Sequence, residues 1–339
     1  MLKPKVFFNL VEIQTKIASL FPFLIGLLFT MAYYGQVNWQ TTALFFGAML
    51  IFDMTTTGIN NLIDYLKSTD THFKTNHNII GTAGLSTKRV ALLLIAMLLT
   101  ATALGLWLVA LTDVVVLFIG TVCFFIGVFY TYGPLPLSRL PLGEVFSGLT
   151  MGLGILFLVV YVNMYHPDTT LFVNEVSEWV SHPLITMDWL AGGLLVISLD
   201  LMALALITLV ALPCVFTIAN IMLANNLCDL AQDIKNNRYT LPYFIGKPMA
   251  IKLFGGLYVA VYVAVLLAFA LGVYTWGMLA VVLASAWPVY QNTKQFVAKQ
   301  AKAQTFVVSI KNMILINTSM ALAFLLDIFY PYLLRLIGL

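Results

Sequence analysis

Two short segments of the chain repeat the pattern Asn-Asn-Leu-x-Asp. We call residues 60–70 the first motif and residues 225–233 the second motif. The candidate oxygen ligands are Asn60, Asp64 and Asp70 in the first and Asn225, Asp229 and Asp233 in the second. Residues four apart lie on one face of an α-helix, so a helical motif would present its oxygens in a row. Carboxylate and amide oxygens suit Mg²⁺, which binds through a few carboxylates together with substrate phosphates. The motifs therefore predict a magnesium and diphosphate site.

Basic side chains accompany both motifs and would neutralise the charge that remains on a bound diphosphate. Lys67 and Arg238 are the leading candidates, and Lys74, Lys88 and Arg89 are further ones. Helix ends that face water often carry acids and bases, so one such cluster alone would not establish a site. Two matched clusters favour function, because charged groups beside membrane spans are costly and are usually retained for a role.

The composition indicates which elements must position these motifs. Of the 339 residues, 61% are hydrophobic and only 9% are charged, and the mean hydropathy is +0.96. A soluble domain carries about 25% charged residues. Apolar runs of roughly 20 residues recur along the chain, which is the length of a helix that crosses a bilayer. We therefore expect an all-α, polytopic membrane protein, with residues 1–339 forming a single membrane-embedded domain.

Nine apolar runs are predicted to span the membrane. They are residues 17–34, 41–60, 90–111, 114–132, 145–163, 202–224, 251–274, 276–290 and 313–334. Residues 189–200 are also apolar but contain Gly192, Gly193 and Asp200. We interpret them as an interfacial lead-in to the sixth span.

The distribution of charge predicts the orientation. With a cytoplasmic N-terminus, every one of the 17 Lys and Arg residues except Arg335 falls on the inside, and the outside segment 166–188 is acidic. This is the bias of the positive-inside rule. It predicts a multi-pass protein of the cytoplasmic membrane, with both motifs and the active site on the cytoplasmic side. The net charge of +3 then follows from the topology, so the lipid bilayer is an expected partner and nucleic acid is not.

The two motifs resemble the aspartate-rich motifs of the UbiA superfamily of intramembrane prenyltransferases. After the second motif, the runs Arg-Tyr-Thr-Leu (238–241) and Ile-Gly (245–246) resemble the 1,4-dihydroxy-2-naphthoate branch. A third block, residues 130–137 followed by Leu-Gly-Glu (142–144), agrees with it, as does the gap from Asp64 to Asp70 with Lys67 between them. One departure is Asn61, which stands where the family usually has an aspartate, so an aspartate there is expected to be tolerated.

The resemblance implies about nine transmembrane helices around a central cavity. It implies transfer of a polyprenyl chain from an allylic diphosphate to an aromatic quinone precursor, 1,4-dihydroxy-2-naphthoate, giving demethylmenaquinone, with Mg²⁺ assisting departure of the diphosphate. The aspartates of both motifs would be catalytic, and they would hold the metal together with Asn60 and Asn225. Tyr130 and Tyr132 would line the acceptor pocket or stabilise the cation, although packing between helices is the more frequent role of an aromatic residue in such a chain.

Two alternatives remain open on the sequence. The acceptor could be 4-hydroxybenzoate, a haem vinyl group or a lipid. A membrane transporter would also have many spans and buried acids, although it would not account for two diphosphate-type motifs on one side. Protein partners are unknown.

Overall fold

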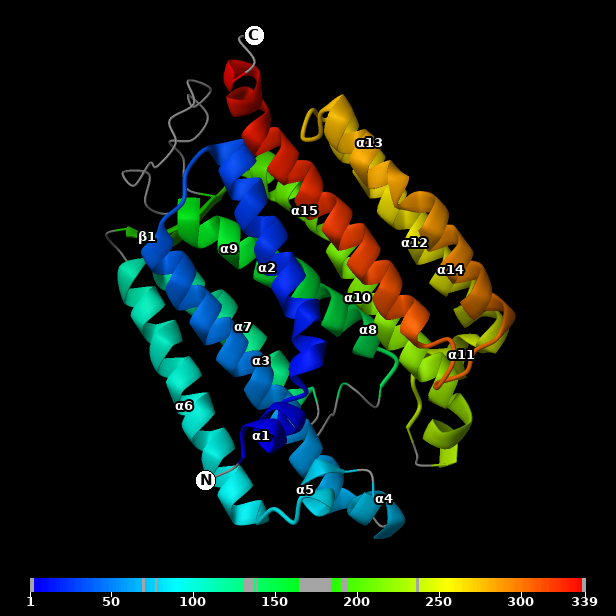
Figure 1. The fold of residues 1–339 in the computed structure, drawn as a ribbon. Helices are drawn as coiled ribbons and strands as arrows, with labels where there is room; N and C mark the ends of the chain where they lie inside the picture. The colour runs from blue at the N-terminus through cyan, green and yellow to red at the C-terminus, as the bar shows by residue number, and fades with distance from the viewer. Residues whose placement is uncertain are drawn as a thin grey trace. The chain divides into compact units, whose positions relative to one another are not determined.

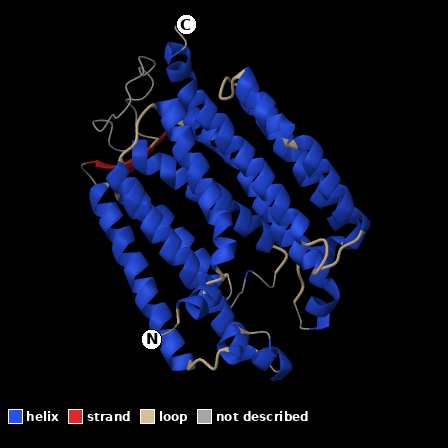
Figure 2. Cartoon of the chain, viewed as in Figure 1, coloured by secondary structure: helices blue, strands red, loops and turns tan. Residues whose placement is uncertain are grey.

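A computed structural model describes residues 3–68, 71–76, 78–130, 137, 140–164, 184–190, 194–235 and 238–336. The chain forms two compact units. The first unit comprises Met1–Leu20 and Gln40–Leu137, and the second comprises Phe21–Trp39 and Ser138–Leu339. Helices dominate the described residues of both units, and the only strands among them are the red pair in Figure 2. The all-α class predicted from composition is thus confirmed.

The first unit contains the first motif. Its elements are α1 (Pro4–Leu10), η1 (Ile13–Lys16), the start of α2 (Ile17–Phe29), α3 (Trp39–Lys67), α4 (Thr71–Asn76), α5 (Ile79–Thr82), α6 (Thr87–Leu111) and α7 (Val114–Phe129). Leu10, Leu62, Ile80, Val90 and Leu94 form a buried apolar cluster at the motif end of α3. Because these residues come from α1, α3, α5 and α6, the cluster fixes the N-terminal segment and the short helices around the first motif.

A buried ion pair ties η1 to the middle of α3. Lys16 is counted as an inside-facing lysine by the charge pattern, but its side chain is only 3% exposed and its ammonium lies 2.7 Å from Asp53 Oδ1. Lys16 also donates to Thr57 Oγ1 at 2.6 Å, and Ser19 Oγ donates to Asp53 Oδ2 at 2.6 Å. Both carboxylate oxygens of Asp53 are therefore satisfied, which a charge among apolar helices requires.

The second unit contains the second motif on its longest helix. Its elements are the rest of α2, η2 (Thr30–Tyr34), α8 (Gly143–Ser147), η4 (Gly148–Gly154), α9 (Ile155–Met164), β1 (Ile185–Leu190), β2 (Leu194–Leu199), α10 (Leu201–Lys235), α11 (Leu241–Ile245), α12 (Lys247–Ala270), α13 (Trp276–Ala284), α14 (Ala286–Ala298) and α15 (Val307–Leu336). The helix α10 packs against α8, η4, α12 and α15, and Figure 1 shows it alongside α12 and α15. It is therefore the central support of this unit.

The strands β1 and β2 pair antiparallel in the segment that the sequence predicts to be an interfacial lead-in. The register pairs Ile185 with Leu199 and Leu190 with Leu194. Ile, Thr, Trp and Val favour the pleated conformation, and a Gly-Gly pair falls between the strands in the sequence. Asp200 then caps α10, because its Oδ1 accepts from the Ala203 amide at 2.9 Å. The strand β2 thus ends directly before the sixth span.

Every predicted span has a helical counterpart, but the count of nine is not settled by helix length. Among the described residues, seven helices are long and apolar enough to cross a membrane: Ile13–Tyr34, Trp39–Lys67, Thr87–Leu111, Gly143–Met164, Leu201–Lys235, Lys247–Ala270 and Val307–Tyr330. The fourth predicted span is the shorter α7, with 16 residues. The eighth is divided between α13 and α14 at Ser285. The chain is therefore a multi-pass membrane protein.

Two glycines bring η4 into backbone contact with α10. A Cβ atom at Gly152 would lie 2.6 Å from the backbone nitrogen of Val215, and one at Gly148 would lie 2.8 Å from its carbonyl oxygen. Small residues four apart allow helices in membranes to approach this closely. This approach sets the position of α8, which directly precedes η4 and carries Glu144.

We predict that Gly152→Ala lowers the melting temperature of the purified protein in detergent. The added methyl group has no space against the α10 backbone, and overpacking of this kind typically costs about 1 to 3 kcal/mol. Gly255→Ala on α12 is the matched control, because nothing lies within 4 Å of a Cβ atom there. The control should melt at the wild-type temperature or slightly above it, since alanine favours a helix more than glycine does. Equal melting of the two variants would contradict the close packing.

Candidate active site

The second motif is helical throughout, as its spacing predicts. Asn225, Asn226, Asp229 and Asp233 all lie in the last three turns of α10. At about 100° per residue, these four side chains occupy an arc of about 100° on one side of the helix. The end of α10 therefore presents two carboxylates and two amides along a single strip.

A lysine from a distant part of the chain binds the first two members of this strip. Lys302, in the segment between α14 and α15, donates to Asn225 Oδ1 through a short hydrogen bond. Its ammonium also lies 2.5 Å from Asp229 Oδ2. One cation is thus shared by an amide oxygen and a carboxylate that are four residues apart. This contact shows that the two oxygens converge on one point.

The second aspartate of the strip pairs with Arg238. The Arg238 guanidinium lies 3.6 Å from Asp233 Oδ1, and the Arg238 amide donates to the Asp233 carbonyl at 2.9 Å. The side chain of Asp233 is only 5% exposed, whereas that of Arg238 is 33% exposed. The arginine therefore lies on the accessible side of a nearly buried carboxylate.

A second buried acid joins the strip from α8. Glu144 Oε1 accepts a hydrogen bond from Asn226 Nδ2 at 2.8 Å, and both residues are buried. Glu144 Oε2, Asn226 Oδ1 and Asp233 Oδ2 are buried oxygens with no hydrogen-bond partner among the described protein atoms. Buried oxygens of this kind usually have a partner, which can be a water or an ion. The strip therefore has spare acceptor capacity for a bound cation.

These donors fit a magnesium ion that shares its coordination with a substrate. No group of three or more His, Cys, Asp and Glu side chains able to hold a metal occurs among the described residues. Mg²⁺ does not need such a group, because it binds through one or two carboxylates together with waters and phosphates. Two carboxylates and two amides meet this requirement, and two of their oxygens already hold an ammonium.

The first motif lies in the first unit, and α3 continues through it to Lys67. Asn60 and Asp64 therefore share a helical face, as predicted. Lys67 is the last residue of α3 and is exposed. Asp70 lies outside the described residues.

Asn61 has a structural role that the sequence did not indicate. Its Nδ2 donates to the Leu10 carbonyl at 3.0 Å and to Glu12 Oε1 at 3.1 Å. The backbone carbonyl of Asn61 accepts a hydrogen bond from Asn78 Nδ2 at 2.9 Å. Asn61 thus ties both the N-terminal segment and the segment after the motif to α3. An aspartate could not donate either side-chain bond and would face the Glu12 carboxylate. These contacts argue against the expectation that aspartate is tolerated there.

The other predicted residues of the first unit are placed individually. The Lys74 ammonium lies 5.6 Å from the ring centroid of Tyr65, which follows Asp64 on α3. Lys88 and Arg89 are exposed in the first turn of α6. Tyr130 directly follows α7 and donates its amide hydrogen to Ile126. Tyr132 lies outside the described residues.

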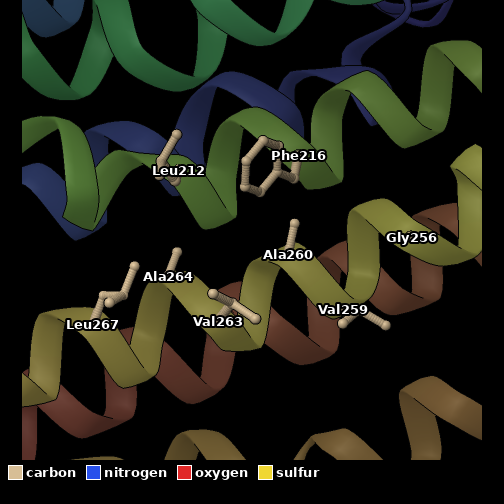
Figure 3. A pocket seen from close by; sticks show the side chains of 8 residues that line it. All are labelled: Leu212, Phe216, Gly256, Val259, Ala260, Val263, Ala264 and Leu267. Atoms are coloured by element: carbon tan, nitrogen blue, oxygen red, sulfur yellow. The ribbon is translucent and has the colours of Figure 1, made fainter.

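A groove between α10 and α12 is large but carries no reactive group. Its volume is about 380 Å³, and Figure 3 shows its lining side chains: Leu212, Phe216, Gly256, Val259, Ala260, Val263, Ala264 and Leu267. Phe216 precedes Asn225 by nine residues, which corresponds to opposite faces of a helix at about 100° per residue. The groove is therefore directed away from the second motif.

Sequence reasoning missed Lys302 and gave Glu144 no role. Lys302 is separated from Asp229 by 73 residues, and no periodicity links them. Glu144 offered a weak signal, because it belongs to the third block. Its contact with Asn226 depends on the packing of η4 against α10, which the sequence does not display.

Comparison with known proteins identifies the family of this chain. Residues 19–318 match the UbiA prenyltransferase family. The chain is 26% identical to a 1,4-dihydroxy-2-naphthoate octaprenyltransferase of Bacillus subtilis (strain 168) over 318 residues, which cover 93% of this chain and 89% of that protein.

Solved structures with the same fold include two UbiA homologues. The homologue from Aeropyrum pernix K1 has a TM-score of 0.63 at 12% identity and covers 90% of this chain and 97% of its own. The homologue from Archaeoglobus fulgidus bound to GPP and Mg²⁺ has a TM-score of 0.60 at 14% identity and covers 95% and 99%. At these identities the likeness concerns the fold.

The family match spans most of the chain and includes both motifs and the supporting helices α8, α10 and α12. This match favours a prenyltransferase over the alternative of a membrane transporter. The chain belongs to the UbiA prenyltransferase family and is a membrane-embedded prenyltransferase.

Proposed function

We propose that this enzyme transfers a polyprenyl chain from an allylic diphosphate to 1,4-dihydroxy-2-naphthoate, giving demethylmenaquinone. The observation that carries the proposal is the strip on α10, where two carboxylates and two amides lie beside Lys302 and Arg238. Oxygen ligands for a cation next to basic groups are what a metal-bound diphosphate requires. The choice of acceptor is supported by the likeness to the Bacillus subtilis naphthoate enzyme.

Each residue of the strip has a distinct part in the proposed reaction. Asn225, Asp229 and Asp233 hold Mg²⁺, which when bound supplies positive charge to stabilise the departing diphosphate. Arg238 and Lys302 donate hydrogen bonds to diphosphate oxygens. Asn226 and Glu144 brace the strip from the α8 side. We assign the same metal-holding role to Asn60, Asp64 and Asp70 of the first motif, with Lys67, Lys74, Lys88 and Arg89 as its basic groups.

The allylic cation left by the diphosphate must meet the aromatic ring before it meets water. Apolar helices exclude water from such a reaction, and the low dielectric strengthens the fixed charges around it. We place Tyr130 and Tyr132 beside the acceptor, where aromatic faces stabilise a cation. Both motifs are placed on the cytoplasmic side, with a cytoplasmic N-terminus, by the positive-inside distribution of Lys and Arg.

The acceptor is tested by product mass. Purified enzyme should be given Mg²⁺, a polyprenyl diphosphate and, in separate reactions, 1,4-dihydroxy-2-naphthoate or 4-hydroxybenzoate. We expect a prenylated product only with the naphthoate, and its mass should show loss of the carboxylate. Prenylation of 4-hydroxybenzoate but not of the naphthoate would contradict the proposed acceptor and identify 4-hydroxybenzoate instead.

The metal is tested in the same reaction. Excess EDTA should abolish turnover, and Mg²⁺ or Mn²⁺ added beyond the chelator should restore it, because the strip offers oxygen ligands. Full activity in EDTA would remove the magnesium assignment.

The charge of the strip is tested by Asp229→Asn, which keeps the shape of the side chain. Loss of one preplaced charge of this kind costs about 2.7 to 4 kcal/mol of transition-state stabilisation, or roughly 10²- to 10³-fold in turnover. Asp327→Asn on α15 is the control, because it makes the same change outside both motifs and should retain turnover. A variant at 229 that stays folded and keeps near-normal turnover would exclude Asp229 from catalysis.

Asn61 is tested through stability. Asn61→Asp removes the bonds to Leu10 and Glu12 and places two carboxylates side by side, which should cost about 1 to 3 kcal/mol. We expect a lower melting temperature. Adding Glu12→Gln should recover part of the loss, because it removes the like-charge contact. An unchanged melting temperature for the single variant would show that Asn61 does not anchor the N-terminal segment.

A further inference from the structure

The segment that carries Lys302 is held by its own hydrogen bonds. Thr305 Oγ1 accepts from the Ala301 amide at 2.9 Å and donates to the Lys299 carbonyl at 2.7 Å. Gln300 Nε2 donates to the Phe296 carbonyl at 2.7 Å, which ties the segment to the end of α14. Residues 299–306 therefore form a turn whose backbone is held by side-chain hydrogen bonds. This turn places Lys302 beside the strip.

The ammonium of Lys302 occupies the point on which two proposed metal ligands converge. It contacts Asn225 Oδ1 and Asp229 Oδ2, and its Nζ lies 4.8 Å from the ring centroid of Phe306. The side chain is 45% exposed, so it can leave the strip without opening the helix packing. A lysine has a flexible four-carbon stem and three donors, so it can exchange one set of oxygens for another.

We propose that Lys302 is a tethered counter-ion that competes with the free metal ion and is transferred to the diphosphate when metal and diphosphate bind together. This inference rests on the proposed metal site of the second motif. An ammonium and a divalent cation cannot share the same two oxygens, so a metal that arrives alone must displace Lys302 without offering it a new partner. A diphosphate that arrives with the metal supplies acceptor oxygens to the displaced ammonium.

The consequence is cooperative binding. Binding of the diphosphate gives the displaced Lys302 ammonium a new partner, and binding of the metal frees that ammonium for the diphosphate. Each ligand therefore raises the affinity for the other, and by linkage the coupling is the same in both directions. The strip is also kept neutralised between turnovers, so that a carboxylate and its neighbours do not stand uncompensated beside apolar helices.

The test compares Mn²⁺ binding, followed by electron paramagnetic resonance, with and without inorganic pyrophosphate. The proteins are the full-length wild type, Lys302→Met, Lys302→Arg and Lys299→Met. In Lys302→Met, we expect Mn²⁺ alone to bind about tenfold more tightly, and the gain from pyrophosphate to fall by a similar factor. Lys302→Arg keeps the cation and should resemble the wild type. Lys299→Met makes the same change at an exposed position of the same turn and should also resemble it.

Two results would overturn the inference in different ways. Wild-type affinity for Mn²⁺ alone in a folded Lys302→Met protein would show that the lysine does not compete with the metal, while leaving the metal site intact. Failure of the wild type to bind Mn²⁺ with or without pyrophosphate would remove the metal site itself, and the role of Lys302 with it. A melting curve for each variant separates loss of binding from loss of fold.

Discussion

A carboxylate placed among apolar helices needs a cation or a donor at its oxygens, because the surrounding medium cannot solvate it. Three of the described aspartates are each paired with a cation. Asp53 is bound by Lys16, Asp229 by Lys302 and Asp233 by Arg238. Two of the pairings join segments that are distant in the sequence, and the third lies at the end of α10, so the need for charge compensation also favours the contacts between these segments. Charge compensation of carboxylates therefore contributes both to the fold and to the candidate site.

The pairings differ in a way that separates structure from chemistry. Lys16 and Asp53 are both well shielded, and their remaining hydrogen bonds go to Ser19 and Thr57. Lys302 and Arg238 are partly exposed, and Asp233, the partner of Arg238, keeps one buried oxygen without a hydrogen-bond partner. A closed network of the first kind stabilises helix packing, whereas an open one can exchange partners. The second motif therefore combines a helical backbone with two partly exposed cations, Arg238 and Lys302.

Much of this arrangement follows from local sequence. The lengths of the apolar runs predicted the membrane helices, and the four-residue spacing placed Asn225, Asp229 and Asp233 on one face of α10. What local sequence could not reveal depends on contacts between distant segments. Lys302 reaches the strip through a turn 73 residues away, and Asn61 has a donor role only because Leu10 and Glu12 are folded against it. The strand pair Ile185–Leu190 and Leu194–Leu199 was not predicted, because a short apolar run with glycines has no helical or strand period long enough to identify it.

The ion pair between Lys16 and Asp53 also bears on how the chain enters the membrane. Asp53 lies near the middle of α3, where an unpaired aspartate costs about 2.5 to 3.5 kcal/mol on insertion scales. Lys16 stands at the start of the preceding apolar helix, so its ammonium is already in place when α3 leaves the ribosome. We therefore expect the first two apolar helices to be inserted as a pair, because Lys16 compensates the charge that Asp53 brings into lipid. The same ion pair would then serve both membrane insertion and the packing of the folded helices.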